Sequence, residues 1–194
     1  MKITDLLSKD AIKLNGIANS KQDAINKLVD LMAKNGNLTD KEKYTQVVLK
    51  REEEGSTGIG EGIAIPHGKT DAVSKPGLSA MVINDGVEFD SLDGQPAKLL
   101  FLIAAPNTKD NVHLDVLSKL SVLMMDEDFS NGLRNAKSVE EFLKIIDKAD
   151  DEKPDIDERL EDTGAKEDSK VKILAVTSCP TGIAHTYMAA EGLE

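Results

Sequence analysis

The 194-residue chain contains one cysteine, no tryptophan and only 3% aromatic residues. A single cysteine excludes an intramolecular disulfide and is typical of a reducing cytoplasm. So few aromatic side chains argue against a base-stacking platform for nucleic acid. Basic residues are also scarce: 24 stand against 35 acidic residues, for a formal charge of −11. This balance argues against nucleic acid or an anionic membrane surface as the main partner.

Long apolar segments are missing as well. The longest run, residues 99–105, is far shorter than the ~20 residues that cross a bilayer. The opening sequence MKITDLLSKD has no long apolar stretch, so we expect neither a signal peptide nor membrane insertion. Hydrophobic residues still make up 40% of the chain, enough for the core of one domain plus a fragment.

Helix signals recur along residues 1–148. Four predicted helices start at residues that can cap a first turn: Ser20, Thr39, Asp110 and Ser138. The first has an acidic residue three positions on and ends at Asn35-Gly36, whereas Thr39-Asp-Lys-Glu42 forms a capping-box sequence.

Strand signals lie between the helices. Ile63–Ile65 predicts a short strand, and Leu78–Ile83 and Val87–Phe89 flank Asn84-Asp85-Gly86, a hairpin-turn signal. The continuous apolar run Lys98–Ala104 predicts a central strand that is buried on both faces. The expected fold class is therefore α/β, with a mixed β-sheet flanked by helices.

A strongly acidic stretch follows this domain. Residues 150–168 hold ten acidic and three basic residues, with Ile156 and Leu160 as the only large apolar ones. This composition predicts a solvated, self-repelling linker. After it, Val171–Thr177 predicts a strand and a helical stretch begins at Ile183. One strand and one helix cannot cover each other's apolar faces, so we expect the chain to be the front part of a longer protein.

The most informative segment is GSTGIGEGIAIPHG, residues 55–68. Its four glycines in eight positions either leave backbone amides free to approach an anion or simply form turns. His67 follows an apolar strand and is held between Pro66 and Gly68. A neutral imidazole is a competent nucleophile whose phosphoramidate transfers phosphoryl groups, although one backbone hydrogen bond would explain the residue equally well.

Two further residues suit a phosphoryl group. His113 falls in the first turn of the helix predicted after Asp110, where amides and the positive dipole end favour an anion, or it faces water. Arg51 precedes the glycine-rich segment and offers a fork of donors, but Glu52–Glu54 follow it and an ordinary ion pair is the alternative. The sequence has no His-x-x-x-His and no cysteine pair, so we expect no metal ion and no cofactor.

Cys179 is the fourth candidate. It lies in Cys-Pro-Thr-Gly between a predicted strand and a predicted helix, where a helix dipole and loop amides stabilise a thiolate. The alternative is a buried, inert cysteine.

These segments resemble a known system. Residues 55–70, GSTGIGEGIAIPHGKT, resemble the active-site segment of the fructose/mannitol-type EIIA domain of the bacterial phosphoenolpyruvate-dependent sugar phosphotransferase system. The segment Asn111-Val-His113-Leu114 matches that family's second histidine. Residues 171–194, VKILAVTSCPTGIAHTYMAAEGLE, resemble the truncated start of a fructose-type EIIB domain. The resemblance implies an EIIA domain at 1–148, an acidic linker at 149–169 and an EIIB fragment at 170–194.

The resemblance also implies a relay. His67 would accept a phosphoryl group from the carrier protein HPr, with His113 and Arg51 holding its oxygens, and pass it to Cys179. A membrane EIIC domain outside this sequence would then hand it to the sugar, with fructose favoured over mannitol. The implied location is the cytoplasm, at the inner face of the membrane in a fused permease.

Two other interpretations stay open. The chain is a regulatory EIIA-like module whose phosphorylation state gates another protein, or a plain α/β scaffold with incidental histidines. The relay itself predicts a pH dependence: phosphoryl transfer should fade as the pH falls through the titration of His67, near about 6.5 for an ordinary histidine.

Overall fold

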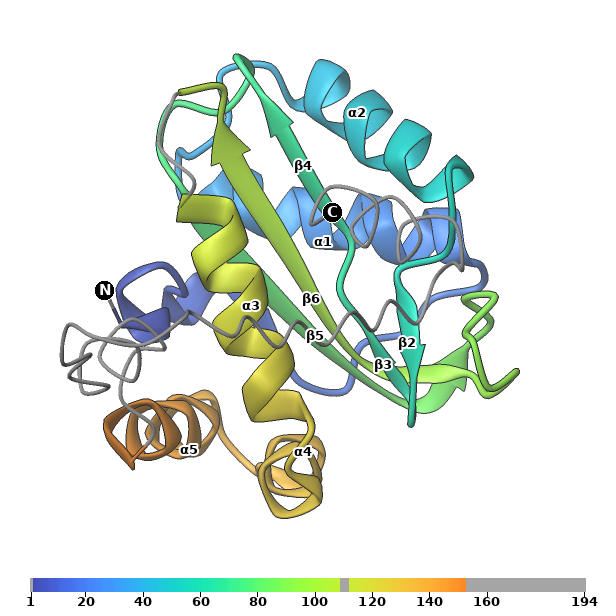
Figure 1. Ribbon diagram of the computed structural model, residues 1–194, viewed down its shortest axis with the longest axis vertical. Helices are drawn as coiled ribbons and strands as arrows, with labels where there is room; N and C mark the ends of the chain where they lie inside the picture. Colours follow the sequence, from blue (N-terminus) through green and yellow to red (C-terminus); the bar gives the residue numbers. More distant parts are fainter. Residues whose placement is uncertain (1, 109–111, 153–194) are drawn as a thin grey trace, which may run out of the picture. The chain divides into compact units, whose positions relative to one another are not determined.

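Figure 1 shows the computed structural model of the chain, which describes residues 2–108 and 112–152. The chain divides into two units, Met1–Asp155 and Ile156–Glu194. The second unit lies outside the described residues, and so do the Asp110 helix cap, the strand predicted at 171–177 and Cys179.

The first unit is an α/β domain with a mixed sheet between helices, as the sequence predicts. Its helices are α1 (Lys21–Lys34), α2 (Lys41–Glu53), α3 (Val112–Met124), α4 (Glu127–Asn135) and α5 (Val139–Glu152), with short 3-10 turns η1 (Ile3–Asp5) and η2 (Lys9–Ala11). Its strands are β1 (Ile12–Lys13), β2 (Gly58–Gly60), β3 (Ile63–Ala64), β4 (His67–Thr70), β5 (Gly77–Val87) and β6 (Ala97–Pro106). Among the described residues, no helix is long and apolar enough to span a membrane.

The central strand β6 sets the order of the sheet. It pairs antiparallel with β5 on one side and parallel with both β3 and β4 on the other. Ile63 is in register with Leu99 and His67 with Ile103, so the offset is the same in both pairs (99 − 63 = 103 − 67 = 36). Strands β3 and β4 therefore follow β6 as one strand interrupted at Pro66, whose nitrogen carries no hydrogen for the ladder.

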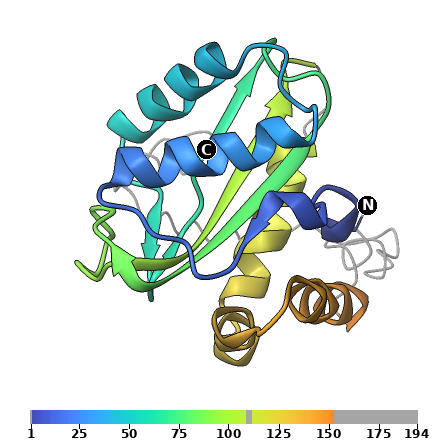
Figure 2. The ribbon, with the colours of Figure 1, turned by 180° about the vertical axis from the view of Figure 1, so that it is seen from behind.

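Side chains of β6 alternate between two hydrophobic clusters. The odd-numbered side chains from Leu99 to Ile103 pack in one cluster with α3, α4 and α5, and the even-numbered ones from Leu100 to Ala104 pack in the other with α1 and α2. The two views of the ribbon show these helix groups on opposite faces of the sheet (Figures 1 and 2). The prediction of a central strand buried on both faces is confirmed.

The helix caps follow the sequence with one shift. The Ser20 and Ser138 hydroxyls accept hydrogen bonds from the amides three residues on, as predicted. Helix α2 is capped by Asp40 and not by Thr39, because the Asp40 carboxylate accepts from the Lys43 amide. The Thr39 amide instead donates to Ala72 O, beside the bridge between Leu38 and Val73. Helix α4 was not predicted from the sequence.

The predicted turn at Asn84-Asp85-Gly86 is not a hairpin. Strand β5 continues to Val87, which pairs with Ala97 of β6, and the register shifts between Val82 and Val87. The residues between them form an irregularity within one strand, and the connection to β6 runs through residues 88–96. Gly86 has φ +75° because it turns the strand here, and a Cβ on it would lie 2.9 Å from Pro96 Cβ.

The end of the domain also departs from expectation. Helix α5 continues to Glu152, so residues 149–152 of the expected linker are helical. Asp150 is buried there, accepting a hydrogen bond from the Ile3 amide at 2.8 Å and pairing with Lys119 at 2.7 Å. A carboxylate with two such partners belongs to the packed domain, which a charge count along the sequence does not reveal.

Gly68 lets α2 pack against β4. It is in register with Ala104, on the sheet face that α1 and α2 cover. A Cβ at this position would lie 3.0 Å from Val48 Cγ2 and 3.2 Å from Tyr44 Cε2. The Tyr44 ring cannot retreat, because its hydroxyl donates to Ile103 O at 2.9 Å inside the core.

We expect Gly68→Ala to lower the free energy of unfolding by about 1–3 kcal/mol, since overfilling a packed contact strains both sides. Urea denaturation measures this. The control is Gly55→Ala, whose Cβ meets nothing within 4 Å and should change the stability by less than about 0.5 kcal/mol. Equal stability of the two variants would contradict the packing of α2 on β4.

Candidate functional site

The site is built around His67, the first residue of β4. Its half-buried ring directs Nδ1 at Ile65 O, 3.0 Å away. A carbonyl oxygen only accepts, so Nδ1 carries the hydrogen and Nε2 is the basic nitrogen of the neutral ring. Because Pro66 interrupts the ladder just before it, His67 stands where the strand resumes beside β6. The backbone therefore fixes both the position of the ring and its tautomer.

The register also fixes the face on which His67 lies. Residues paired across adjacent strands project to the same side of a sheet, and the partner of His67 is Ile103. Ile103 packs in the cluster that contains Val116 of α3. The first turn of that helix carries His113, as predicted, although the His113 side chain lies outside what the structure describes. Both histidines thus belong to the α3 side of the sheet.

Arg51 lies in the last turn of α2 and reaches the same region. Its Nη1 donates to Gly55 O at 3.1 Å, and its charge lowers the pKa of His67, which places it within electrostatic reach of the ring. Among residues 2–108 and 112–152 it joins none of the ion pairs, so the alternative of pairing with Glu52–Glu54 is wrong. The guanidinium keeps donors for another acceptor near His67.

The glycine-rich segment forms turns and does not present a row of free amides. Strands β2 and β3 pair antiparallel across it, and residues 60–62 all have positive φ. The Gly58 amide donates to Ser56 Oγ at 3.0 Å and the Glu61 amide to Asp93 Oδ2 at 2.8 Å. Of the two interpretations offered by the sequence, the glycines as turn residues fit this geometry.

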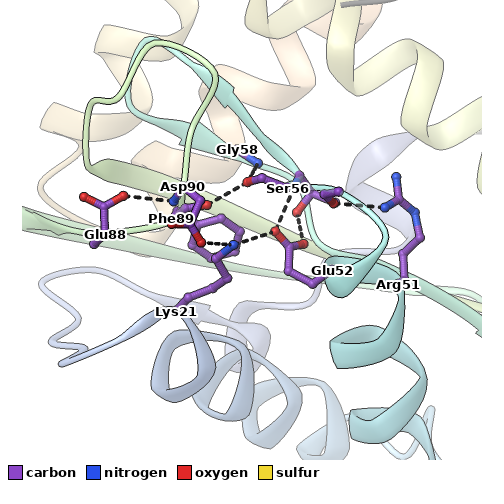
Figure 3. Close-up of polar contacts among 10 residues, drawn as sticks. Lys21, Arg51, Glu52, Ser56, Gly58, Glu88, Phe89 and Asp90 are labelled. Atoms are coloured by element: carbon purple, nitrogen blue, oxygen red, sulfur yellow. Dashed lines mark hydrogen bonds and ion pairs between the residues drawn. The ribbon is translucent and has the colours of Figure 1, made fainter. Parts of the chain in front are cut away.

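Glu52 is a feature that the sequence interpretation missed. It is buried, and its carboxylate accepts from the Thr57 amide at 2.8 Å, from the Thr57 hydroxyl at 2.6 Å and from Lys21 Nζ at 3.2 Å (Figure 3). The signal was its position: with Tyr44 and Val48 it completes a series of buried residues four apart on α2. A carboxylate on the apolar stripe of a helix indicates a dedicated partner.

Burial has the largest effect on the pKa of His67. It lowers the pKa of the ring below the usual 6.5, because a charged imidazole loses hydration there. The hydrogen bond with Ile65 opposes this shift, the charge of Arg51 adds to it, and Glu52 opposes it. The net direction is downward, so the ring is neutral at pH 7 and Nε2 holds an available lone pair. That is the state that a nucleophile requires.

Comparison with known proteins identifies a family to which the chain is similar. A family model described as "Phosphoenolpyruvate-dependent sugar phosphotransferase system, EIIA 2" matches residues 5–149. The chain is also similar to the PTS system fructose-specific EIIABC component of Bacillus subtilis (strain 168), with 48% identity over 194 residues. That match covers the whole chain and 30% of the relative. The chain spans less than a third of the length of the curated relatives that it matches first.

Solved structures share the fold. The nitrogen regulatory protein IIA-Ntr of Neisseria meningitidis matches with a TM-score of 0.68 and 30% identity, over 73% of this chain and 97% of that one. A complex of enzyme IIAMTL with phosphorylated enzyme IIBMTL from Escherichia coli matches with a TM-score of 0.64 and 30% identity, over 74% and 99%. These matches confirm the mixed sheet flanked by helices.

The lowered pKa of His67 predicts a titration midpoint below pH 6.5, measured by NMR of the ring nitrogens. Proton uptake is complete only below that midpoint, so the nucleophilic form persists further into acid than an ordinary histidine allows. In Arg51→Gln the midpoint should rise, because a nearby positive charge is removed. A midpoint above 6.5 in the unaltered chain would contradict the burial of the ring.

Proposed function

Because the chain belongs to the EIIA type 2 family of the phosphoenolpyruvate-dependent sugar phosphotransferase system, we propose that His67 is the residue on which it carries a phosphoryl group. Membership confirms the resemblance found in the sequence, and EIIA domains are phosphotransferase components of that system. The observation that carries the proposal is the Nδ1 contact with Ile65 O, which leaves a neutral Nε2 as the reactive nitrogen.

The chemistry is a displacement at phosphorus. Nε2 of His67 attacks the phosphoryl group of a donor phosphohistidine, for which the phosphotransferase system supplies HPr. The new N–P bond forms as the donor's N–P bond breaks, and the electron pair of the broken bond stays on the donor nitrogen. Such a transfer needs positioning and charge stabilisation more than covalent help. The Arg51 guanidinium supplies the positive charge, and His113, in the first turn of α3, supplies a second donor to the oxygens.

The onward acceptor is a cysteine thiolate of an EIIB domain, and the candidate in this sequence is Cys179. Its sulfur would attack the phosphoryl group on His67, forming an S–P bond and returning neutral imidazole. Two observations support this step. The structurally similar IIAMTL occurs in a complex with phosphorylated IIBMTL, and the whole chain, including residues 171–194, aligns with an EIIABC component. That relative is named for fructose, which we propose as the sugar, with an EIIC domain delivering it at the inner face of the membrane.

A regulatory role is the second candidate, because the similar Neisseria structure is a nitrogen regulatory protein. The segment around Cys179 favours the relay, since a pure regulator needs no EIIB acceptor. Discharge of phosphorylated His67 by purified EIIB separates the two. A phosphoryl group that stays on His67 when EIIB is added would favour the regulator.

We expect the chain to gain acid-labile phosphate when incubated with phosphoenolpyruvate, the general phosphotransferase enzyme and HPr. Mass spectrometry of the intact chain and of its peptides locates the group. His67→Ala should abolish labelling of residues 1–148. His185→Ala, which removes the third histidine of the sequence and lies outside those residues, is the control and should leave it unchanged. Label on residues 1–148 of His67→Ala would overturn the assignment.

Arg51→Gln should slow phosphorylation of His67 by about 10²-fold, since it removes a charge aimed at the developing phosphoryl oxygens. Rapid-quench measurement of the single-turnover rate tests this. Lys50→Gln removes an exposed charge from the same helix turn and controls for net charge. Equal rates for the two variants would show that Arg51 does not act on the phosphoryl group.

A further inference from the structure

A chain of hydrogen bonds connects the buried Glu52 to the nucleophilic histidine. The Glu52 carboxylate holds Thr57 through both its amide and its hydroxyl. The carbonyl of Thr57 accepts from the Ile65 amide at 3.0 Å, and Ile65 O accepts from His67 Nδ1 at 3.0 Å. Every link lies within residues 52–67, and the route runs from the end of α2 through the residues next to β2 and β3 to the first residue of β4. Thr57 and Ile65 therefore connect the Glu52 carboxylate to the imidazole.

The Glu52 carboxylate also binds the loop that Arg51 contacts. Residues 54–57 connect α2 to β2, and Arg51 Nη1 binds that loop at Gly55 O. Because Glu52 ties the far end of the loop at Thr57, the segment between the two contacts is short and held at both sides. Arg51 and His67 thus share one anchor.

Glu52 is in turn linked to α1, and through it to the residues after β5. Lys21, at the start of α1, lies between Glu52 Oε1 at 3.2 Å and Asp90 Oδ2 at 2.6 Å, and its Nζ is 5.2 Å from the centroid of the Phe89 ring. Although burial opposes its charge, the contacts with Asp90 and Glu52 raise the pKa of Lys21. Ser56 Oγ donates to Phe89 O at 2.6 Å, so the loop is also tied to the residues after β5 (Figure 3).

A buried carboxylate is costly unless its oxygens are satisfied. Glu52 meets that requirement with three donors, and an apolar residue at this place on the α2 stripe would lack all of these contacts. These three hydrogen bonds explain why a carboxylate occupies this buried position. The carboxylate holds Thr57, which is hydrogen-bonded to Ile65 and closes the loop that Arg51 contacts.

We propose that Glu52 is a positioning residue of the phosphoryl-acceptor site, fixing the loop of residues 54–57 so that His67 presents Nε2 and Arg51 faces it. This role rests on the proposed function of His67. Glu52 takes no part in bond making. It acts through Thr57 and Ile65 on the imidazole and through Gly55 on the guanidinium, and its charge opposes the effect of Arg51 on the pKa of His67.

Three variants test this. Glu52→Gln keeps the shape of the side chain and removes its charge, and Thr57→Val removes only the hydroxyl that donates to Oε2. Thr57→Ser restores that hydroxyl and is the rescue variant. Glu53→Gln, an exposed neighbour on α2, controls for loss of one acidic residue. The melting temperature of each full-length variant establishes that it is folded.

The first readout is NMR of the ring nitrogens of His67 in the unphosphorylated chain. The unaltered chain should hold the Nδ1–H tautomer, and Glu52→Gln and Thr57→Val should show a mixture of both tautomers. The titration midpoint should also fall in Glu52→Gln, because a neighbouring negative charge is lost. A purely structural role of Glu52 would lower the melting temperature without moving either signal.

The second readout is the single-turnover rate of phosphorylation by phosphorylated HPr. We expect about a tenfold loss in Glu52→Gln and Thr57→Val and rates within about twofold of the unaltered chain in Thr57→Ser and Glu53→Gln. Unchanged tautomer and rate in folded Glu52→Gln and Thr57→Val would overturn the proposal; where Glu52→Gln fails to fold, the two Thr57 variants decide it.

The two readouts separate this inference from the proposed function. A tautomer shift in the variants of a chain that accepts no phosphate would support the positioning role and overturn the phosphoryl relay. Normal labelling of every variant with an unmoved tautomer would support the relay and overturn the positioning role.

Discussion

The interruption of one strand at Pro66 is the constraint on which the site depends. Strands β3 and β4 keep a single register along β6, so the break displaces nothing on either side of it. Ile65 O, just before the break, accepts a hydrogen bond from the imidazole two residues on. The strand that sets this register, β6, is buried on both faces. A nucleophile placed there takes its position from the backbone of β4 and from the hydrogen bond with Ile65 O.

Arg51 and Glu52 are adjacent on α2 and carry opposite charges, but their side chains lie in different surroundings. Arg51 remains half-buried at the edge of the site, whereas Glu52 faces the interior and the loop. Successive residues of a helix point about a quarter turn apart, which is why neighbours in sequence can face solvent and core. The series Tyr44, Val48 and Glu52 lies on the inward side, and its last member binds a loop instead of packing against an apolar partner.

Local signals predicted much of this structure. The Ser20 cap, the apolar run at Lys98–Ala104 and the Pro66–Gly68 setting of His67 each act over a few residues, and the structure has them as expected. The predictions were wrong where contacts between residues far apart in the sequence determine the local structure. Gly86 turns within a strand because Val87 pairs with Ala97, and Asp150 joins the domain because it meets Ile3 and Lys119. An ion pair of Arg51 with Glu52–Glu54 was the alternative that the sequence left open, and the contact of Glu52 with Lys21 could not be predicted because the two residues lie 31 positions apart.

A carrier must release its phosphoryl group as readily as it accepts it, and this requirement bears on the charges near His67. A positive charge alone would stabilise the phosphorylated histidine and hinder its discharge. The carboxylate of Glu52 counteracts this positive charge, since Arg51 lowers the pKa of the ring and Glu52 raises it. Both residues contact the same loop, Arg51 at Gly55 O and Glu52 at the Thr57 amide. For the proposed role of His67, opposing charges favour a phosphohistidine that is neither strongly stabilised nor strongly strained, which is the condition for transfer in either direction.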